Sequence, residues 1–230
     1  MVTVVIPTYN EALNIVKLIP LLKEEFSKAQ ISDYEVLIMD DNSPDKTHDI
    51  VLSLNDTKVR SVNRKGRPKG LSYSVIDGIL ESRGDVVGVM DADLSHPSSL
   101  VPPLIKAVQG GASLAVGSRY VPGGGVENWP LKRRLASRIA CYLGNLVTPV
   151  KDSTSGFFFF KKEIIEGASL SPLGFKIGLE VFVKARHKNQ IVELPYVFRD
   201  RQAGESKLSG TVVYYYFQQV LTLLRYRPHP

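Results

Sequence analysis

The sequence predicts an α/β fold in which helices flank a mostly parallel sheet. Short apolar runs alternate along the chain with stretches of helical periodicity, which is the order that βαβ units produce. Hydrophobic residues make up 43% and charged residues 23% of the 230 residues, a balance typical of a globular protein with a substantial core. Because the sequence contains no repeat and no low-complexity linker, we expect one domain over residues 1–230.

Each strand in the first half is predicted from an apolar run, and each helix from the periodic segment that follows it. The first helix carries Leu13 and Val16 on the same apolar face as Ile19, Leu22 and Phe26. The third helix ends before Gly84, and a proline is tolerated in the first turn of the fourth. The strands are predicted at residues 2–7, 34–40, 58–63, 85–90 and 112–118, and the helices at residues 11–28, 46–54, 70–82 and 97–108.

The second half changes in character after Tyr120. Pro122 and the three glycines that follow it predict a flexible loop. The helix at residues 131–146 is basic and amphipathic, and the helix at residues 210–227 combines aromatic residues with leucines, a pattern typical of helices on a membrane surface. The alternative is that both helices pack on the domain with their aromatic side chains in the core. Between them we expect a strand at residues 157–160, a helix at 179–187 and a strand at 190–194.

Net charge, cysteine content and apolar segments indicate the kind of partner and the cellular compartment of the protein. The net charge of +6 suggests an anionic partner, which includes phosphate ligands, anionic lipid and nucleic acid. The one cysteine, Cys141, has no partner for an internal disulfide, as expected in a reducing compartment, and we expect it to be a small buried residue rather than a nucleophile. The apolar stretch at residues 211–224 is too short to cross a bilayer, and the N-terminus lacks the features of a secretory signal. We therefore expect a cytoplasmic protein.

Polar and acidic residues follow three of the predicted strands, at residues 8–11, at 40–45, and at Asp91 and Asp93. Ligands of open α/β sheets bind beyond the carboxyl ends of the strands, so these clusters are predicted to meet at one edge. Each cluster alone is also explained by turn or helix-cap chemistry. Together they are expected to repel one another unless some are protonated or a cation lies between them, and hard divalent cations prefer oxygen ligands. The Asp-x-Asp spacing suits Mg²⁺ or Mn²⁺ that also binds a diphosphate.

Several other enzyme classes are disfavoured by the motifs that the sequence lacks. The four histidines lie far apart, and there is no GxSxG, no Walker lysine motif and no GxGxxG after the first strand. These absences argue against zinc hydrolases, serine hydrolases, P-loop enzymes and dinucleotide oxidoreductases.

Seven strings, in order along nearly the whole chain, resemble those of one family. They are VVIPTYNE (4–11), DDNSPD (40–45), MDADLSHP (90–97), GSRY (117–120), VENWP (126–130), DSTSGFF (152–158) and GESKLSG (204–210). The strings resemble glycosyltransferase family 2, and within it they are most similar to dolichyl-phosphate mannosyltransferases. The first three are widespread in the family, whereas VENWP and the RxxGESKL segment are more specific for polyprenyl-phosphate acceptors. The resemblance implies a GT-A type, Rossmann-like catalytic domain with a C-terminal amphipathic helix.

The resemblance also implies the residues of the site, position by position. Metal binding would fall to Asp91 and Asp93, with Ser95 acting through water because its hydroxyl is shorter than the glutamine that relatives often carry. The implied catalytic residues are Asp91, Asp93, Arg119 and Arg201. The implied substrate-binding residues are Pro7, Tyr9, Glu11, Ile38 and Asp40 for the nucleotide, Ala92 and Ser95 beside the metal, Lys176 near the donor, and Arg119, Arg133, Ser137, Arg201 and Lys207 for the phosphates.

The implied reaction is inverting transfer of mannose from GDP-mannose to dolichyl or polyprenyl phosphate, giving dolichyl β-D-mannosyl phosphate and GDP. A phosphate monoester is already anionic near neutral pH, since its second pKa is about 6, so no strong general base is required. The expected partner surface is the cytoplasmic face of a membrane. Relatives often carry a transmembrane region after the final helix; its absence here would be natural, or would reflect a separate membrane-anchoring subunit or a shortened sequence.

Three alternatives remain at this stage. The donor could be UDP-glucose or another sugar nucleotide. A basic nucleic-acid-binding module would use the arginines and tyrosines on phosphates and bases, but the acidic strand ends speak against it and we expect no nucleic-acid partner. A membrane-bound scaffold that has lost catalysis is disfavoured because every acidic motif is retained. Without the family resemblance, an isolated arginine is interpreted as a solvated surface residue. The resemblance gives Arg134 and Arg138 no role, and they keep that interpretation.

Overall fold

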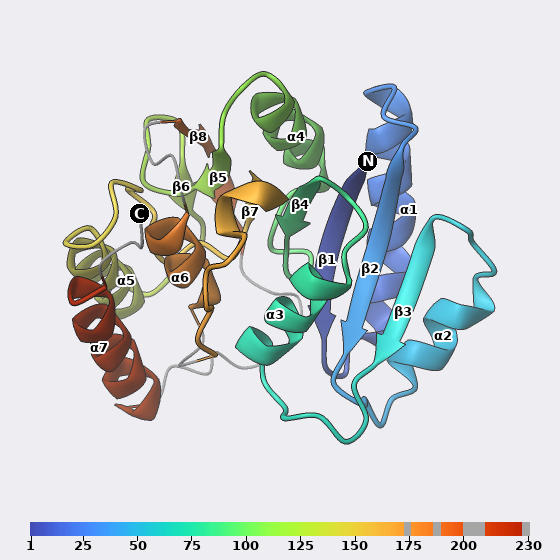
Figure 1. The fold of residues 1–230 in the computed structure, drawn as a ribbon, viewed down its shortest axis with the longest axis horizontal. Helices are drawn as coiled ribbons and strands as arrows, with labels where there is room; N and C mark the ends of the chain where they lie inside the picture. Colours follow the sequence, from blue (N-terminus) through green and yellow to red (C-terminus); the bar gives the residue numbers. More distant parts are fainter. Residues whose placement is uncertain (173–175, 186–189, 200–209, 227–230) are drawn as a thin grey trace.

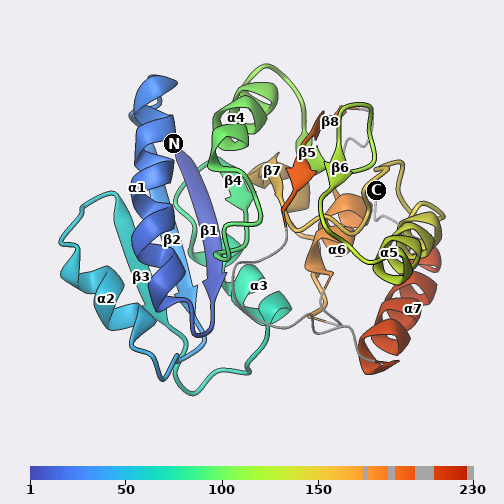
Figure 2. The same cartoon turned by 180° about the vertical axis from the view of Figure 1, so that it is seen from behind.

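A central sheet of seven strands has helices on both of its faces (Figures 1 and 2). The structure is a computed structural model that describes residues 1–172, 176–185, 190–199 and 210–226. Its strand order is β3-β2-β1-β4-β7-β5-β8, and only β7 runs antiparallel to its neighbours. The strands are β1 (Val2–Thr8), β2 (Tyr34–Asp40), β3 (Val59–Asn63), β4 (Val86–Val89), β5 (Leu114–Ser118), β7 (Phe158–Lys161) and β8 (Ile191–Pro195). The predicted mostly parallel sheet is confirmed.

Two hydrophobic clusters divide the helices between the faces of the sheet. One cluster joins the sheet to α1, α2 and α4, and the other joins it to α3 and α6. The helices are α1 (Ala12–Lys28), α2 (Thr47–Ser53), α3 (Leu71–Glu81), α4 (Val101–Gln109), α5 (Leu131–Gly144), α6 (Ile177–Lys184) and α7 (Gly210–Leu224), with short 3₁₀ helices η1 (Ser98–Leu100) and η2 (Lys162–Ile165). Every predicted helix is present, with ends that differ by a few residues.

The predicted apolar face of α1 was partly wrong. Ile19, Leu22 and Phe26 are buried as expected, but they share that face with Ile15 and Leu18. The two residues that the periodicity had favoured, Leu13 and Val16, are exposed. The predicted and the observed apolar faces both contain Ile19, Leu22 and Phe26. The spacing alone therefore did not decide which residues of the N-terminal half of α1 face the core.

The antiparallel strand β7 fits beside β4 because β4 has a glycine at the contact. Gly88 pairs with Phe159, and a Cβ on Gly88 would overlap the Phe159 ring. The aromatic run Phe157–Phe160 is fully buried and supplies side chains to both clusters. This run therefore connects the two halves of the sheet.

The sequence did not predict a second, two-stranded sheet near the carboxyl end of β5. Strand β6 (Gly125–Val126) lies in the segment expected to be only a loop, and it pairs in parallel with β9 (Val197–Phe198). Gly124 packs so tightly against the backbone of Ser118 and Arg119 that a Cβ there would lie 2.6 Å from the Ser118 carbonyl oxygen. This glycine brings the loop onto the end of β5.

Helices α5, α6 and α7 pack together at one end of the molecule, where α5 and α7 lie side by side in both views (Figures 1 and 2). Leu179, Val183, Tyr216, Val220 and Leu223 form the contact. The Tyr216 hydroxyl donates to the Ala140 carbonyl at 2.8 Å. In the part of the chain that is described, no helix has both the length and the apolar composition needed to cross a membrane.

Candidate active site

The carboxyl ends of β1, β2, β3 and β4 meet at one edge of the sheet, because all four strands are parallel. Thr8 pairs with Asp40, and Asp40 pairs with Asn63. Asp91 and Asp93 follow β4 at the same edge. The predicted convergence of the three polar clusters is confirmed.

The first cluster combines exposed and buried side chains. Tyr9 is 47% exposed, and the Lys69 ammonium group lies 5.3 Å from the centre of its ring. Glu11 is half-buried and accepts a hydrogen bond from the Asn14 amide at 2.6 Å. Pro7 is buried. Of the three residues predicted to contact a nucleotide here, Tyr9 presents the most accessible surface.

Asp40 is buried and holds the ends of β1 and β2 together. Its carboxylate accepts hydrogen bonds from the Thr8 hydroxyl at 3.0 Å, the Ser43 hydroxyl at 2.6 Å and the Ser43 backbone N–H at 2.9 Å. Ile38 is fully buried in the core. The contact of these two residues with a base and ribose stays a prediction, whereas their structural role is visible.

The other acidic groups of the second cluster are also satisfied within the protein. Asp41 forms an ion pair with buried Arg64 and accepts from the Gly70 N–H at 2.8 Å. Asp45 accepts from the Ala12 N–H at the start of α1 and from Thr47. Burial tends to raise the pKa of Asp45, but these hydrogen bonds lower it overall.

Within residues 40–45, Arg64 offsets the charge of Asp41, while hydroxyl and backbone N–H groups donate hydrogen bonds to Asp40 and Asp45. A cation between the acidic clusters stays a prediction. Among the described residues, no group of three or more histidine, cysteine, aspartate or glutamate side chains is arranged to hold a metal. Any cation at this edge would depend on the Asp-x-Asp pair and on phosphate oxygens.

Asp91 and Asp93 lie in a tight turn after β4. Asp93 accepts hydrogen bonds from the Ser95 N–H at 3.1 Å and the Ser95 hydroxyl at 2.5 Å, and Leu94 between them has a positive φ of 60°. The side chain of Asp91 is 32% exposed, and Gly156 lies beside it, where an added Cβ would be in ordinary contact with its carboxylate at 3.6 Å. Ala92 is buried.

This donor set fits a divalent cation. Mg²⁺ usually takes one or two protein carboxylates and completes its shell with phosphate and water. Asp91 and Asp93 supply that number, from adjacent positions on one turn. The Ser95 hydroxyl donates its proton to Asp93, and its role toward the metal stays a prediction.

His96 closes the same turn and was not singled out from the sequence. Its ring is 3% exposed, and its Nδ1 accepts a hydrogen bond from the Asp91 backbone N–H at 3.1 Å. Burial lowers the pKa of His96 and outweighs the opposing effect of Asp91 and Asp93. His96 could have been identified from its place in the MDADLSHP string. It was missed because the four histidines were considered only for their separation along the chain.

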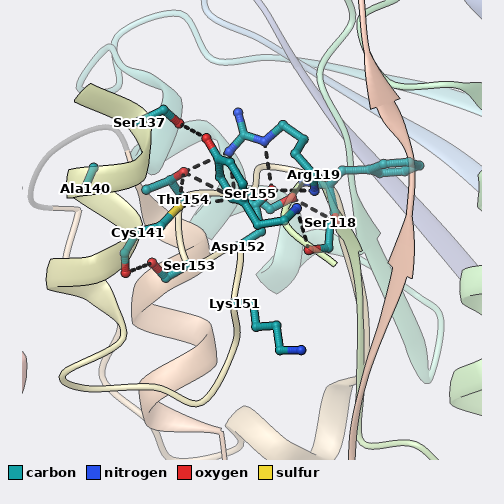
Figure 3. Close-up of polar contacts among 12 residues, drawn as sticks. Ser118, Arg119, Ser137, Ala140, Cys141, Lys151, Asp152, Ser153, Thr154 and Ser155 are labelled. Carbon is teal, nitrogen blue, oxygen red and sulfur yellow. Dashed lines mark hydrogen bonds and ion pairs between the residues drawn. The ribbon is translucent and has the colours of Figure 1, made fainter. Parts of the chain in front are cut away.

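Arg119, predicted as a phosphate clamp, lies in a buried ion pair with Asp152 (Figure 3). Its Nε and Nη2 donate to the two carboxylate oxygens at 2.8 and 2.7 Å, and its backbone N–H donates to the same carboxylate at 2.9 Å. Nη2 also donates to the Thr154 hydroxyl at 2.8 Å. Although burial opposes it, Asp152 raises the pKa of Arg119. The direct contact of Arg119 with a phosphate remains a prediction.

The Arg119–Asp152 pair links β5 to α5 and to the 152–158 segment. Cys141 of α5 is buried beside Thr154, with 3.3 Å between the sulfur and the hydroxyl oxygen. Burial and the charge of Asp152 raise the pKa of Cys141, which supports its predicted role as a small core residue. Asp152 was present in the DSTSGFF string but had been given no function.

Lys176 lies on the same side of the site. Its ammonium group donates to the Thr154 carbonyl at 3.1 Å. Burial and the charge of Arg119 lower the pKa of Lys176, while Asp91 and Asp152 act in the opposite direction. The predicted position of Lys176 near the donor stays a prediction.

The remaining predicted residues divide into two groups. On α5, the Arg133 guanidinium lies 4.0 Å from the centre of the Trp129 ring, and the Ser137 hydroxyl accepts from the Tyr120 hydroxyl at 2.7 Å. Arg201 and Lys207 lie outside the described residues.

Comparison with known proteins gives consistent matches. The family model for glycosyl transferase family 2 matches residues 3–167. The chain is 42% identical to the dolichol-phosphate mannosyltransferase of Pyrococcus furiosus over 233 residues, which cover 98% of this chain and 64% of that protein. It is 36% identical to the dolichol-phosphate mannosyltransferase of Saccharomyces cerevisiae, over 96% of this chain and 86% of that one. This chain therefore spans slightly less than two thirds of the archaeal relative.

Two solved structures have similar folds at low sequence identity. Mannosyl-3-phosphoglycerate synthase from Rubrobacter xylanophilus matches with a TM-score of 0.69 and 19% identity, covering 98% of this chain and 74% of that one. Glucosyl-3-phosphoglycerate synthase from Mycobacterium tuberculosis, in complex with Mn²⁺, UDP and glucosyl-3-phosphoglycerate, matches with a TM-score of 0.68 and 20% identity, covering 97% and 78%. These similarities show the fold alone.

Proposed function

This chain belongs to glycosyltransferase family 2 and has a GT-A fold, and we propose that it transfers mannose from GDP-mannose to dolichyl or polyprenyl phosphate with inversion, releasing GDP. The observation that carries the proposal is the 36–42% identity, over nearly the whole chain, to proteins named dolichol-phosphate mannosyltransferase. The Asp-x-Asp turn at the carboxyl edge of the sheet supports it. In this proposal residues 1–230 act as one catalytic domain.

The metal is proposed to be Mg²⁺ or Mn²⁺, held by Asp91 and Asp93. When bound, such an ion stabilises the negative charge of the leaving diphosphate. The Ser95 hydroxyl fixes the Asp93 carboxylate by donating to it. A protonated Lys176 would favour the diphosphate of the donor.

The acceptor is proposed to attack without a general base. A phosphate monoester is already an anion near neutral pH, so the protein has to align it rather than deprotonate it. The described histidine nearest the acidic turn, His96, uses Nδ1 as an acceptor for backbone and is buried. Arg133 and Ser137 on α5, together with Arg201 and Lys207, are the proposed contacts for the acceptor phosphate. Arginine suits this task because its planar fork can bind phosphate through two parallel hydrogen bonds.

The donor is tested by supplying GDP-mannose, UDP-glucose and UDP-GlcNAc separately with a short polyprenyl phosphate and Mn²⁺. We expect kcat/KM for GDP-mannose to exceed that for either uridine donor by at least about 100-fold, since a site built to hydrogen-bond one base leaves polar groups unpaired with another. Lipid-linked mannose is measured by extraction and mass spectrometry. Turnover with only a uridine donor rejects the mannose assignment and favours the alternative.

We also propose that the α5–α7 end of the molecule lies on the cytoplasmic face of a membrane. Both helices expose apolar side chains along one face, and the two helices are adjacent (Figures 1 and 2). The packing alternative for α7 accounts for Tyr216, Val220 and Leu223, which are buried against α6. The exposed set is Leu131, Leu135, Ile139, Tyr142 and Leu146 around α5, and Val213, Tyr214, Phe217, Leu221 and Leu224 on α7. A separate membrane-anchoring subunit is a further proposed partner.

A matched pair of variants tests the membrane surface. Leu131 on α5 and Leu13 on α1 are both 80% exposed, but only Leu131 belongs to the proposed surface. We expect Leu131→Gln combined with Leu135→Gln to weaken binding to anionic vesicles about tenfold or more, because each buried leucine contributes roughly 1.5–3 kcal/mol. Leu13→Gln should bind as the wild type does. Equal vesicle co-sedimentation of all three proteins would remove α5 from the membrane contact.

A further inference from the structure

His96 is enclosed by aromatic rings that hold it in one orientation. Phe157 stacks on the imidazole with 4.8 Å between ring centroids and 10° between planes. Tyr196 and Phe198 meet it edge-on, at 5.8 and 6.2 Å. A ring that is 3% exposed and packed on several sides has little freedom to rotate, so the directions of its two nitrogen atoms are fixed.

Both nitrogen atoms of His96 lie within 4 Å of an atom of Asp91. Nδ1 accepts the Asp91 backbone N–H at 3.1 Å, so Nδ1 carries no proton and the N–H of the neutral ring is on Nε2. Nε2 lies 3.9 Å from Oδ2 of the Asp91 carboxylate. This separation is too long for a direct hydrogen bond, but it keeps the imidazole close to the carboxylate. One imidazole thus fixes the backbone of Asp91 and lies near its side chain.

The turn between the two residues requires such a support. Leu94 has a positive φ of 60°, which is unfavourable for a side chain with a Cβ and persists only when the surrounding structure enforces it. The hydrogen bond from Asp91 to His96 closes the turn across this residue. Loss of the acceptor would leave a partly buried N–H unpaired and would free the turn to relax.

From this geometry we infer that His96 is a positioning residue, which sets the Asp91 carboxylate for the divalent cation and donor diphosphate. The inference rests on the proposed function. It differs from the ordinary interpretation of a buried histidine as a core aromatic, in which packing alone matters. Partners that orient a metal-binding side chain typically change metal affinity or activity by about 10–100-fold when they are removed.

Two substitutions separate positioning from packing. His96→Phe keeps a flat ring among Phe157, Tyr196 and Phe198 but has no acceptor. His96→Asn loses ring packing but places an amide oxygen near the position of Nδ1, where it can accept the Asp91 N–H. If His96 positions Asp91, the asparagine variant should bind metal more tightly than the phenylalanine variant, although it unfolds at a lower temperature. If His96 acts by packing alone, the phenylalanine variant should have both the higher metal affinity and the higher Tm.

The experiment measures Mn²⁺ affinity in the presence of GDP, by electron paramagnetic resonance, together with metal-free thermal unfolding. We expect His96→Phe to bind Mn²⁺ about 10–100-fold more weakly than the wild type while its Tm stays near the wild-type value. We expect His96→Asn to bind Mn²⁺ at least about tenfold more tightly than His96→Phe, despite its lower Tm. If His96→Phe does not fold, His96→Leu replaces it as the apolar variant without an acceptor.

Each outcome decides the inference. Mn²⁺ affinity that follows Tm across the variants, or an unchanged affinity in His96→Phe, overturns the positioning role. A wild-type protein that binds neither Mn²⁺ nor GDP refutes the proposed function instead, so the two failures are distinguishable.

Discussion

Replacing Asp91 by asparagine is expected to lower kcat/KM for mannosyl transfer about 10³-fold while leaving the fold intact. The change keeps the size of the side chain and removes the negative charge that would bind the cation. Electrostatic groups placed at a developing charge typically contribute 10²–10³-fold each, and a lost metal ligand adds to that. Because Asp91 is partly exposed at the edge of the sheet, its carboxylate adds little packing energy. Initial rates with GDP-mannose and Mn²⁺ measure the effect.

Asp85→Asn is the matched control, since Asp85 precedes the same strand at its opposite end. Its side chain is highly exposed and pairs with the N-terminal ammonium group at 3.3 Å. Exposed ion pairs contribute little to stability, so this variant should keep wild-type activity and Tm. Full activity of Asp91→Asn, with an unchanged Tm, would remove the acidic turn from the active site.

Asp152→Asn is expected to lower the free energy of unfolding by about 3–5 kcal/mol, because it leaves the buried Arg119 guanidinium without its counter-charge. Chemical denaturation measures the loss. The control is Glu24→Gln, which removes an exposed partner of Lys28 and should change stability by less than about 0.5 kcal/mol. Equal effects of the two substitutions would mean that the Arg119–Asp152 pair does not stabilise the fold.

The same pair predicts a pH dependence. Burial tends to raise the pKa of Asp152, but the hydrogen bonds and charge of Arg119 outweigh it and lower the pKa below its ordinary value. A carboxylate with a lowered folded-state pKa stabilises the protein fully above its unfolded pKa of about 3.9, and this contribution is lost as the pH falls further. Below about pH 4, wild-type stability should therefore decrease more steeply than that of Asp152→Asn.

The elements of the fold could be predicted because their signals are local. An apolar run such as residues 34–40 indicates a buried strand without reference to the rest of the chain, and the structure has β2 at the same residues. The position of β7 could not be predicted in this way. Phe158–Lys161 pairs with strands that lie far earlier in the sequence, and no local periodicity records which strands it separates. The β6–β9 pairing was missed for the same reason.

In the site, too, the features with a local signal could be predicted and those that depend on distant residues could not. Asp91 and Asp93 could be assigned because an acidic pair directly follows an apolar run. The charge balance of Asp41 could not, since its partner Arg64 lies 23 positions later. Arg119 and Asp152 are separated by 33 positions, so an arginine expected to face a ligand was found with a partner inside the protein. Pairings between distant residues decide which charges remain available to a substrate.

The placement of β7 has a consequence for biosynthesis. A ribosome releases β4 and β5 before the strand that must lie between them, so the nascent chain has two strands whose final neighbour has not yet been made. The βαβ units that precede β4 can assemble early, because all their pairing partners have already emerged. Direct pairing of β4 with β5 would be a kinetic trap, and the sheet is completed only after the aromatic segment leaves the exit tunnel.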